Sequence, residues 1–124
     1  MQLVLTIAIF GALGCLARYG LSGLVYNLTG RAFPYGTLAV NIIGAFLIGF
    51  IMEFSLRSAL IPQQLRVGIT IGFLGGLTTF STFSFETFKL LEEGQFQIAV
   101  ANATISVVAC LACTWLGITA ARYL

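Results

Sequence analysis

Four long apolar segments constrain this chain more than any other feature of its sequence. They run from about Leu3 to Tyr26, Gly36 to Leu56, Leu65 to Leu91 and Ile98 to Tyr123. A helix crosses the bilayer with about 20 mostly apolar residues, so each segment is long enough to span it. Only 8% of the residues are charged, against roughly 25% in soluble domains. The chain is therefore expected to be a multi-pass protein of the lipid bilayer.

The connections between these segments are short, and they set the expected topology. They cover Asn27 to Pro34, Arg57 to Gln64 and Glu92 to Gln95. Short loops make consecutive helices antiparallel neighbours. We therefore expect an all-α membrane protein with a single four-helix transmembrane domain over residues 1–124, with both termini on one side.

The ionisable residues argue against several classes of function. A net charge of +2, with scattered basic residues, gives no basic patch for a nucleic acid. The chain has no His and only four acidic residues without metal-ligand spacing, which argues against a metalloenzyme. No nucleophile–base set or P-loop is visible, and no enzymatic activity is expected.

Lys and Arg are divided almost evenly between the two expected membrane faces. Those on the side of the termini are Arg57, Arg66 and Arg122; those toward the other side are Arg18, Arg31 and Lys89. Membrane orientation follows asymmetry in these residues, and here there is almost none. Either a weak bias still fixes one orientation, or the protein inserts both ways and forms an antiparallel dimer. Charge alone leaves both open.

The third span is expected to break near its centre, and its stretch Gly68 to Glu86 is the candidate functional site. Gly75-Gly76 is the weakest helix-forming pair in the chain. Five hydroxyl residues follow within seven positions: Thr78, Thr79, Ser81, Thr82 and Ser84. Polar, irregular backbone at membrane depth is tolerated only where it is buried in protein or lines a wet cavity.

The glycines of this span have two possible uses. Gly68, Gly72 and Gly76 form two overlapping GxxxG units, which suit either pairing between chains or packing against the other helices. The break from Gly75 to Thr78 frees carbonyl oxygens that could coordinate a small cation. If two copies of the break meet at a dimer axis, such a cation would be structural rather than transported.

The aromatic residues after the break have a similar ambiguity. Phe80 and Phe83 are three residues apart, so they share a helix face. Such rings usually belong to a core, but a ring also has a positive edge. Ring edges and neutral hydroxyls could hold a small anion weakly enough to let it move on.

Three further polar residues leave alternatives open. Arg18 either attracts anions in a vestibule or lies at the membrane interface. Asn41 either donates to an anion or bonds another helix. Glu86 shares a face with Thr82, and it could orient that hydroxyl or carry protons.

A polar stripe runs along the fourth span. Asn102, Ser106 and Cys110 recur every four residues, so they share one helix face. The stripe could line an anion path with neutral donors, whereas small residues for tight packing would explain Ser106 and Cys110 but not Asn102.

The third-span sequence Gly72-Phe-Leu-Gly-Gly-Leu-Thr-Thr-Phe-Ser-Thr-Phe-Ser-Phe-Glu86 resembles the signature of the Fluc/CrcB fluoride channels. The stretches Gly14 to Tyr19 and Gly36 to Asn41 resemble its two other motifs, and the likeness extends over all four spans. The resemblance implies a passive fluoride channel of the bacterial-type plasma (inner) membrane that exports cytoplasmic fluoride. It also implies an antiparallel dual-topology homodimer with two pores.

The resemblance further implies roles for single residues. Phe80 and Phe83 would line the pores with their ring edges, Asn41 would be the pore asparagine, and Arg18 the vestibule arginine. Backbone carbonyls of Gly75 and Thr78 would bind a central structural sodium ion. The remaining pore residues assigned here are Ser81, Thr82, Glu86, Ser106 and Asn102. Family members can have Tyr in place of Asn102 and Ser in place of Cys110.

Two other functions fit a small four-helix membrane protein. A dual-topology, proton-coupled drug exporter would need a carboxylate deep in a span, but Glu53 and Glu86 lie toward span ends. A helper subunit without transport would leave the Thr/Ser/Phe-rich segment unexplained.

Overall fold

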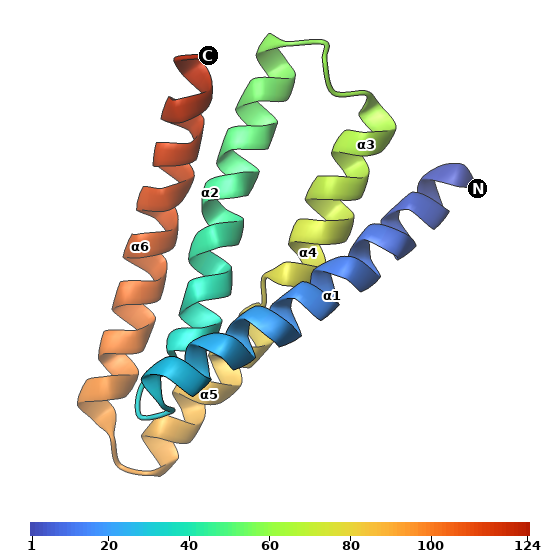
Figure 1. The fold of residues 1–124 in the computed structure, drawn as a ribbon. Helices are drawn as coiled ribbons and strands as arrows, with labels where there is room; N and C mark the ends of the chain where they lie inside the picture. Colours follow the sequence, from blue (N-terminus) through green and yellow to red (C-terminus); the bar gives the residue numbers. More distant parts are fainter.

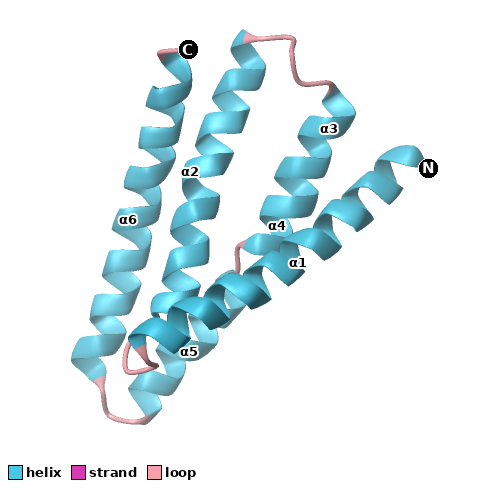
Figure 2. Cartoon of the chain, viewed as in Figure 1, coloured by secondary structure: helices cyan, strands magenta, loops and turns pink.

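The computed structural model describes residues 1–124 and contains helices but no strands (Figure 1, Figure 2). Three spans are continuous helices: α1 (Gln2–Thr29), α2 (Tyr35–Arg57) and α6 (Phe96–Arg122). The third span is assembled from α3 (Gln63–Val67), η1 (Gly68–Phe73), α4 (Leu74–Leu77) and α5 (Phe80–Glu92). All four are long and apolar enough to cross a membrane, which confirms the four predicted segments and the broken third helix.

The arrangement follows from the short loops. Both termini lie at one end of the bundle, together with the α2–α3 connection, and the other two connections lie at the opposite end (Figure 1). Helices α2 and α6 run side by side, while α1 crosses the third span obliquely. The turn after α5 is closed by Gly94, at φ 75°, whose N–H donates to Leu91 O while Gln95 N donates to Leu90 O. This pair of bonds is a Schellman motif, which favours glycine.

The glycines of the third span pack against α1. A Cβ on Gly76 would lie 2.6 Å from Gly11 O, and one on Gly72 would lie 2.9 Å from Ile7 O. Gly68 faces the same helix. The GxxxG units therefore serve packing within the chain, because only glycine lets the two backbones approach this closely.

Helices α2 and α6 are joined in the same way. A Cβ on Gly49 would collide with the Thr114 carbonyl, and one on Gly117 would collide with the Phe46 carbonyl. Thr114 Oγ1 also donates a hydrogen bond to Ala45 O at 3.1 Å. Small residues and an interhelical hydrogen bond thus hold this pair together, as expected where lipid provides no hydrophobic drive for helix association.

Candidate functional site

The third span leaves the helical conformation at Thr78 and Thr79. Their backbones are extended, with φ/ψ of −87°/154° and −151°/115°. The expected break covered Gly75 to Thr78, but Gly75 and Gly76 are helical within α4. Tertiary packing explains the difference, because Gly76 must keep its place against α1. The preceding π-helical segment η1 was not predicted.

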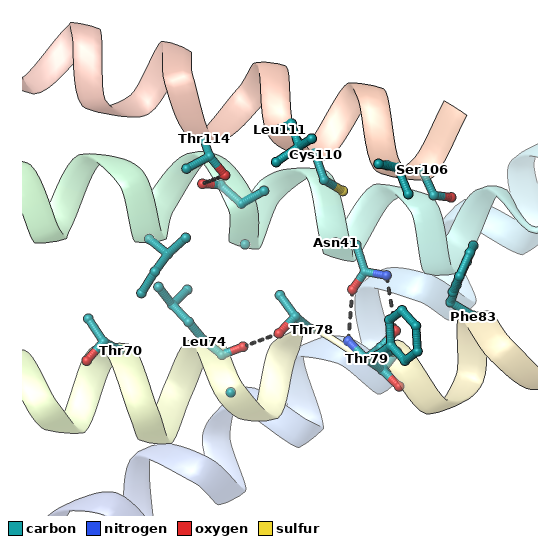
Figure 3. A pocket seen from close by; sticks show the side chains of 16 residues that line it. Asn41, Thr70, Leu74, Thr78, Thr79, Phe83, Ser106, Cys110, Leu111 and Thr114 are labelled. Carbon is teal, nitrogen blue, oxygen red and sulfur yellow. Dashed lines mark hydrogen bonds between the residues drawn. The ribbon is translucent and has the colours of Figure 1, made fainter. Parts of the chain in front are cut away.

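Asn41 of α2 holds the extended backbone in place. Its Oδ1 accepts from Thr79 N at 2.8 Å, and its Nδ2 donates to Thr79 O at 3.1 Å (Figure 3). The carboxamide thus satisfies both backbone groups of one residue, as a neighbouring strand would. Since an Asn amide has two N–H groups, one donor is left over beyond this helix-to-helix contact.

Hydroxyl groups cluster where α5 begins. Thr79 Oγ1 accepts from Thr82 N at 3.2 Å, which makes Thr79 the N-cap of α5. The same oxygen donates to Thr82 Oγ1 at 3.0 Å and lies 3.3 Å from Ser81 Oγ. These hydroxyls stand at the positive end of the helix dipole, where negative charge is favoured.

The break takes their helical donors away from the carbonyls just before it, including the two predicted to bind a cation. In a continuous helix Gly75 O would accept from Thr79 N, and Thr78 O would accept from Thr82 N. Here Thr79 N donates to Asn41 and Thr82 N donates to the Thr79 hydroxyl, so both carbonyls lose these donors. A Cβ on Gly75 would meet nothing of its own chain within 4 Å. Carbonyl oxygens are ligands of the kind that hard cations prefer.

A cavity of about 540 Å³ lies between α2, α6 and the broken span; we call it the break cavity (Figure 3). The predicted site residues that line it are Asn41, Gly75, Thr78, Phe80, Phe83 and Ser106. The Phe80 and Phe83 rings are tilted by 49° with centroids 5.4 Å apart, and Phe80 is 78% exposed. No charged side chain lines this cavity, so its donors are neutral.

A second cavity, of about 360 Å³, is lined by the charged residues among the predicted site residues; we call it the Glu86 pocket. It is lined by Arg18, Thr82 and Glu86, among others. The Glu86 carboxylate accepts hydrogen bonds from Tyr26 OH, at 2.9 Å, and from Thr37 Oγ1. Thr79 lines both cavities, so they adjoin at the helix break.

The α6 stripe is placed differently from the other candidates. Asn102 is only 2% exposed and lines neither cavity. Its Nδ2 donates to Thr87 Oγ1 at 2.8 Å, and its Oδ1 accepts from Ser106 Oγ at 3.4 Å. Thr87 in turn donates to Phe83 O. Asn102 thus connects the cavity residue Ser106 to α5. Ser81 is exposed and also lines neither cavity.

Tyr26, Thr37 and Thr87 were not recognised from the sequence. A carboxylate within a span needs donors, and this requirement could have prompted a search for partners of Glu86. Thr37 stands four residues before Asn41 and therefore on the same helix face. Nothing in the pattern distinguishes Tyr26 from an interfacial tyrosine.

Comparison with known proteins gives consistent matches over the whole chain. Residues 5–118 match the family model described as CrcB-like protein, Camphor Resistance (CrcB). The fluoride-specific ion channel FluC of Geotalea daltonii is 73% identical, and that of Geobacter metallireducens is 69% identical. The protein of that name from Geobacter sulfurreducens is 66% identical. Each alignment covers the full length of both chains.

Proposed function

This chain belongs to the CrcB family, and from this premise we propose that it is a fluoride-selective passive ion channel that lowers cytoplasmic fluoride. The observation that carries the proposal is the break cavity, in a chain 73% identical to a fluoride-specific ion channel. The cavity combines hydroxyls, a carboxamide and two phenylalanine rings without a charged side chain. Neutral donors and positive ring edges can replace part of the hydration of a small anion without trapping it.

Passive export suits the chemistry of fluoride. The weak acid enters a cell as neutral HF, ionises in the more alkaline cytoplasm and is trapped as the anion. A selective pore in the plasma membrane lets the membrane potential drive the anion out. Arg18, which lines the Glu86 pocket, would draw anions toward the hydroxyls of Thr82 and Ser81 at the start of α5.

The pores are proposed to form between two copies of the chain in opposite orientations. The released carbonyls of Gly75 and Thr78 cannot face lipid, because irregular backbone at membrane depth must be buried in protein or lie beside water. Phe80 is largely exposed in the single chain. A second copy would cover this face, and the even distribution of Lys and Arg permits both orientations. Two-fold symmetry would then give two equivalent pores.

A sodium ion is proposed to bind at the contact between the two breaks. The carbonyls of Gly75 and Thr78 would hold it, since both lose their helical donors. The ion would supply a fixed positive charge that joins the subunits. Assembly with a large organic cation in place of sodium is expected to impair fluoride flux, and unchanged flux would contradict this role.

Ion efflux from liposomes that contain the purified protein tests the function. Rapid fluoride efflux with negligible chloride efflux is expected, with protein-free liposomes as the control. Absence of fluoride efflux from a well-folded dimer would refute the proposal.

The drug-exporter alternative gains no support from the cavities. Such an exporter needs a carboxylate free to exchange protons for a cationic drug in the middle of the membrane. The break cavity contains no carboxylate, and Glu86 is already bound by two hydroxyl donors.

A further inference from the structure

Two guanidinium groups line the Glu86 pocket, and neither is paired with a carboxylate. They belong to Arg18 on α1 and to Arg31 in the loop between α1 and α2. The ion pairs of the chain are Lys89–Glu92 and Arg122–Glu53. Arg31 is exposed and also lines an adjoining pocket of about 380 Å³.

The position of Arg31 is set by the Tyr26 ring. The guanidinium carbon lies 4.5 Å from the ring centroid, within the range of a cation–π contact. The ring itself lies against α2, because a Cβ on Gly36 would be 2.6 Å from Tyr26 Cδ2. The Tyr26 ring therefore restricts the position of this exposed loop arginine.

The other end of Tyr26 is tied to the carboxylate. Its hydroxyl donates to Glu86 at 2.9 Å and lies 3.3 Å from Thr37 Oγ1. Glu86 is thus held by hydroxyls of α1 and α2, and neither arginine forms an ion pair with it. This arrangement keeps the charge of Arg31 available to an approaching ion.

We propose that Arg31, held on the face of Tyr26, is a second anion-attracting cation at the mouth of the Glu86 pocket, with Tyr26 as its positioning residue. The inference rests on the proposed fluoride-channel function and extends it to a loop residue outside the resembled motifs. Arg31 acts by raising the local concentration of the anion, and it does not bind the ion within the pore.

This kind of action depends on ionic strength. The Debye length is about 30 Å at 0.01 M and about 3 Å at 1 M. Attraction by an exposed charge is therefore strong in dilute salt and nearly absent in concentrated salt. A packing role of the same side chain would not change with salt.

The test is fluoride efflux at these two ionic strengths, set with an impermeant organic salt at constant sodium. For Arg31→Gln we expect roughly two- to fivefold slower efflux at low ionic strength, less than the tenfold or more that a whole charged cleft supplies. At high ionic strength it should match the wild-type protein. Arg31→Lys keeps the charge and should retain most of the flux. Arg66→Gln is the matched control, because Arg66 lines none of the three pockets described.

Variants of Tyr26 separate the role of its ring from the role of its hydroxyl. Tyr26→Phe keeps the ring, so the further Arg31→Gln change should still slow efflux at low ionic strength. Tyr26→Leu removes the ring, so the further change should have little additional effect. Such non-additivity is the measure of coupling between two residues.

The outcomes are distinct. Equal flux of Arg31→Gln and wild-type protein at low ionic strength would overturn the inference, and so would a loss of the same size at both ionic strengths. Full additivity in the Tyr26→Leu background would refute the positioning role of Tyr26. Absence of flux in the wild-type protein would instead refute the proposed function, and the role of Arg31 with it.

Discussion

At the scale of single residues, the site depends on side chains that satisfy backbone groups. Asn41 bonds both the N–H and the carbonyl of Thr79, and the Thr79 hydroxyl caps α5. The extended pair at positions 78 and 79 would otherwise leave polar groups unpaired at membrane depth, at a cost of about 1–3 kcal/mol each. The side chains that fix the break are thus the same ones that line the cavity.

Two substitutions of Asn41 separate its structural role from a role toward the anion. Asn41→Ala removes both bonds and leaves two backbone groups unpaired, so it should lower stability by about 2–6 kcal/mol. Asn41→Asp can still accept from Thr79 N, so it should unfold at a higher temperature than Asn41→Ala. Its added negative charge should nevertheless reduce fluoride efflux more than tenfold. Thermal unfolding in detergent and liposome efflux are the measurements, and wild-type efflux of Asn41→Asp would contradict the second role.

The phenylalanine rings give a second prediction at this scale. Phe80→Ile and Phe83→Ile keep an apolar side chain but remove the ring edge, and each is expected to slow fluoride efflux at least tenfold while the dimer persists. Phe88→Ile is the control, because Phe88 is exposed on the same helix and lines neither cavity. If both cavity variants conduct like the wild-type protein, the rings do not act on the anion.

At the scale of elements, close backbone contact at glycines packs α1 against the third span, as it packs α2 against α6. The interface uses glycines where a soluble protein would bury large side chains. Of the 124 residues only 17 are buried within the single chain. Packing therefore depends on close fit more than on apolar area.

This close fit predicts a contrast between two glycines. Gly76→Ala would place its Cβ against the backbone of α1, and we expect a loss of about 1–3 kcal/mol in stability, as for other overpacked sites. Gly23→Ala meets nothing within 4 Å and should be neutral or slightly stabilising, because alanine favours helix. Thermal unfolding of the two variants in detergent measures the difference, and equal stability would contradict the packing role.

At the scale of the whole molecule, the single chain leaves its functional face uncovered. Gly75 differs from its neighbours Gly72 and Gly76 because nothing in its own chain excludes a side chain there. In the proposed dimer, the second copy would fill the space beside Gly75 and leave no room for a side chain there.

Gly75→Leu should therefore leave the single chain folded but prevent assembly. We expect light scattering in detergent to report a monomer for this variant and a dimer for the wild-type protein. Gly20→Leu is a matched control, because Gly20 also has no neighbour within 4 Å and lies on α1 away from the break cavity. A dimer of unchanged stability in Gly75→Leu would show that the contact lies elsewhere.

Much of the fold was predictable because lipid imposes a simple length rule. The four spans, the connections and the broken third helix follow from apolar length and from unfavourable helix residues. The position of the break did not follow from these rules. Gly76 is kept helical by its contact with α1, and sequence spacing does not reveal this contact. Asn102 shows the same limit: its spacing marks a polar face, but only the fold shows that this face is buried against Thr87.

The π-helical segment η1 sets the angular phase of everything that follows it in the third span. An α-helix advances about 100° per residue, and the wider π turn accommodates one additional residue. Deleting one residue from Gly68–Phe73 would let the segment return to α-helical winding, so Gly76 would keep its place against α1 and the rings and hydroxyls would keep theirs. The same residues wound as a regular α-helix would instead turn everything after them by about 100°. The chain would still cross the membrane, yet its polar face would point in a different direction. Length alone secures membrane insertion, whereas the direction of the site rests on how one extra residue is wound upstream of it.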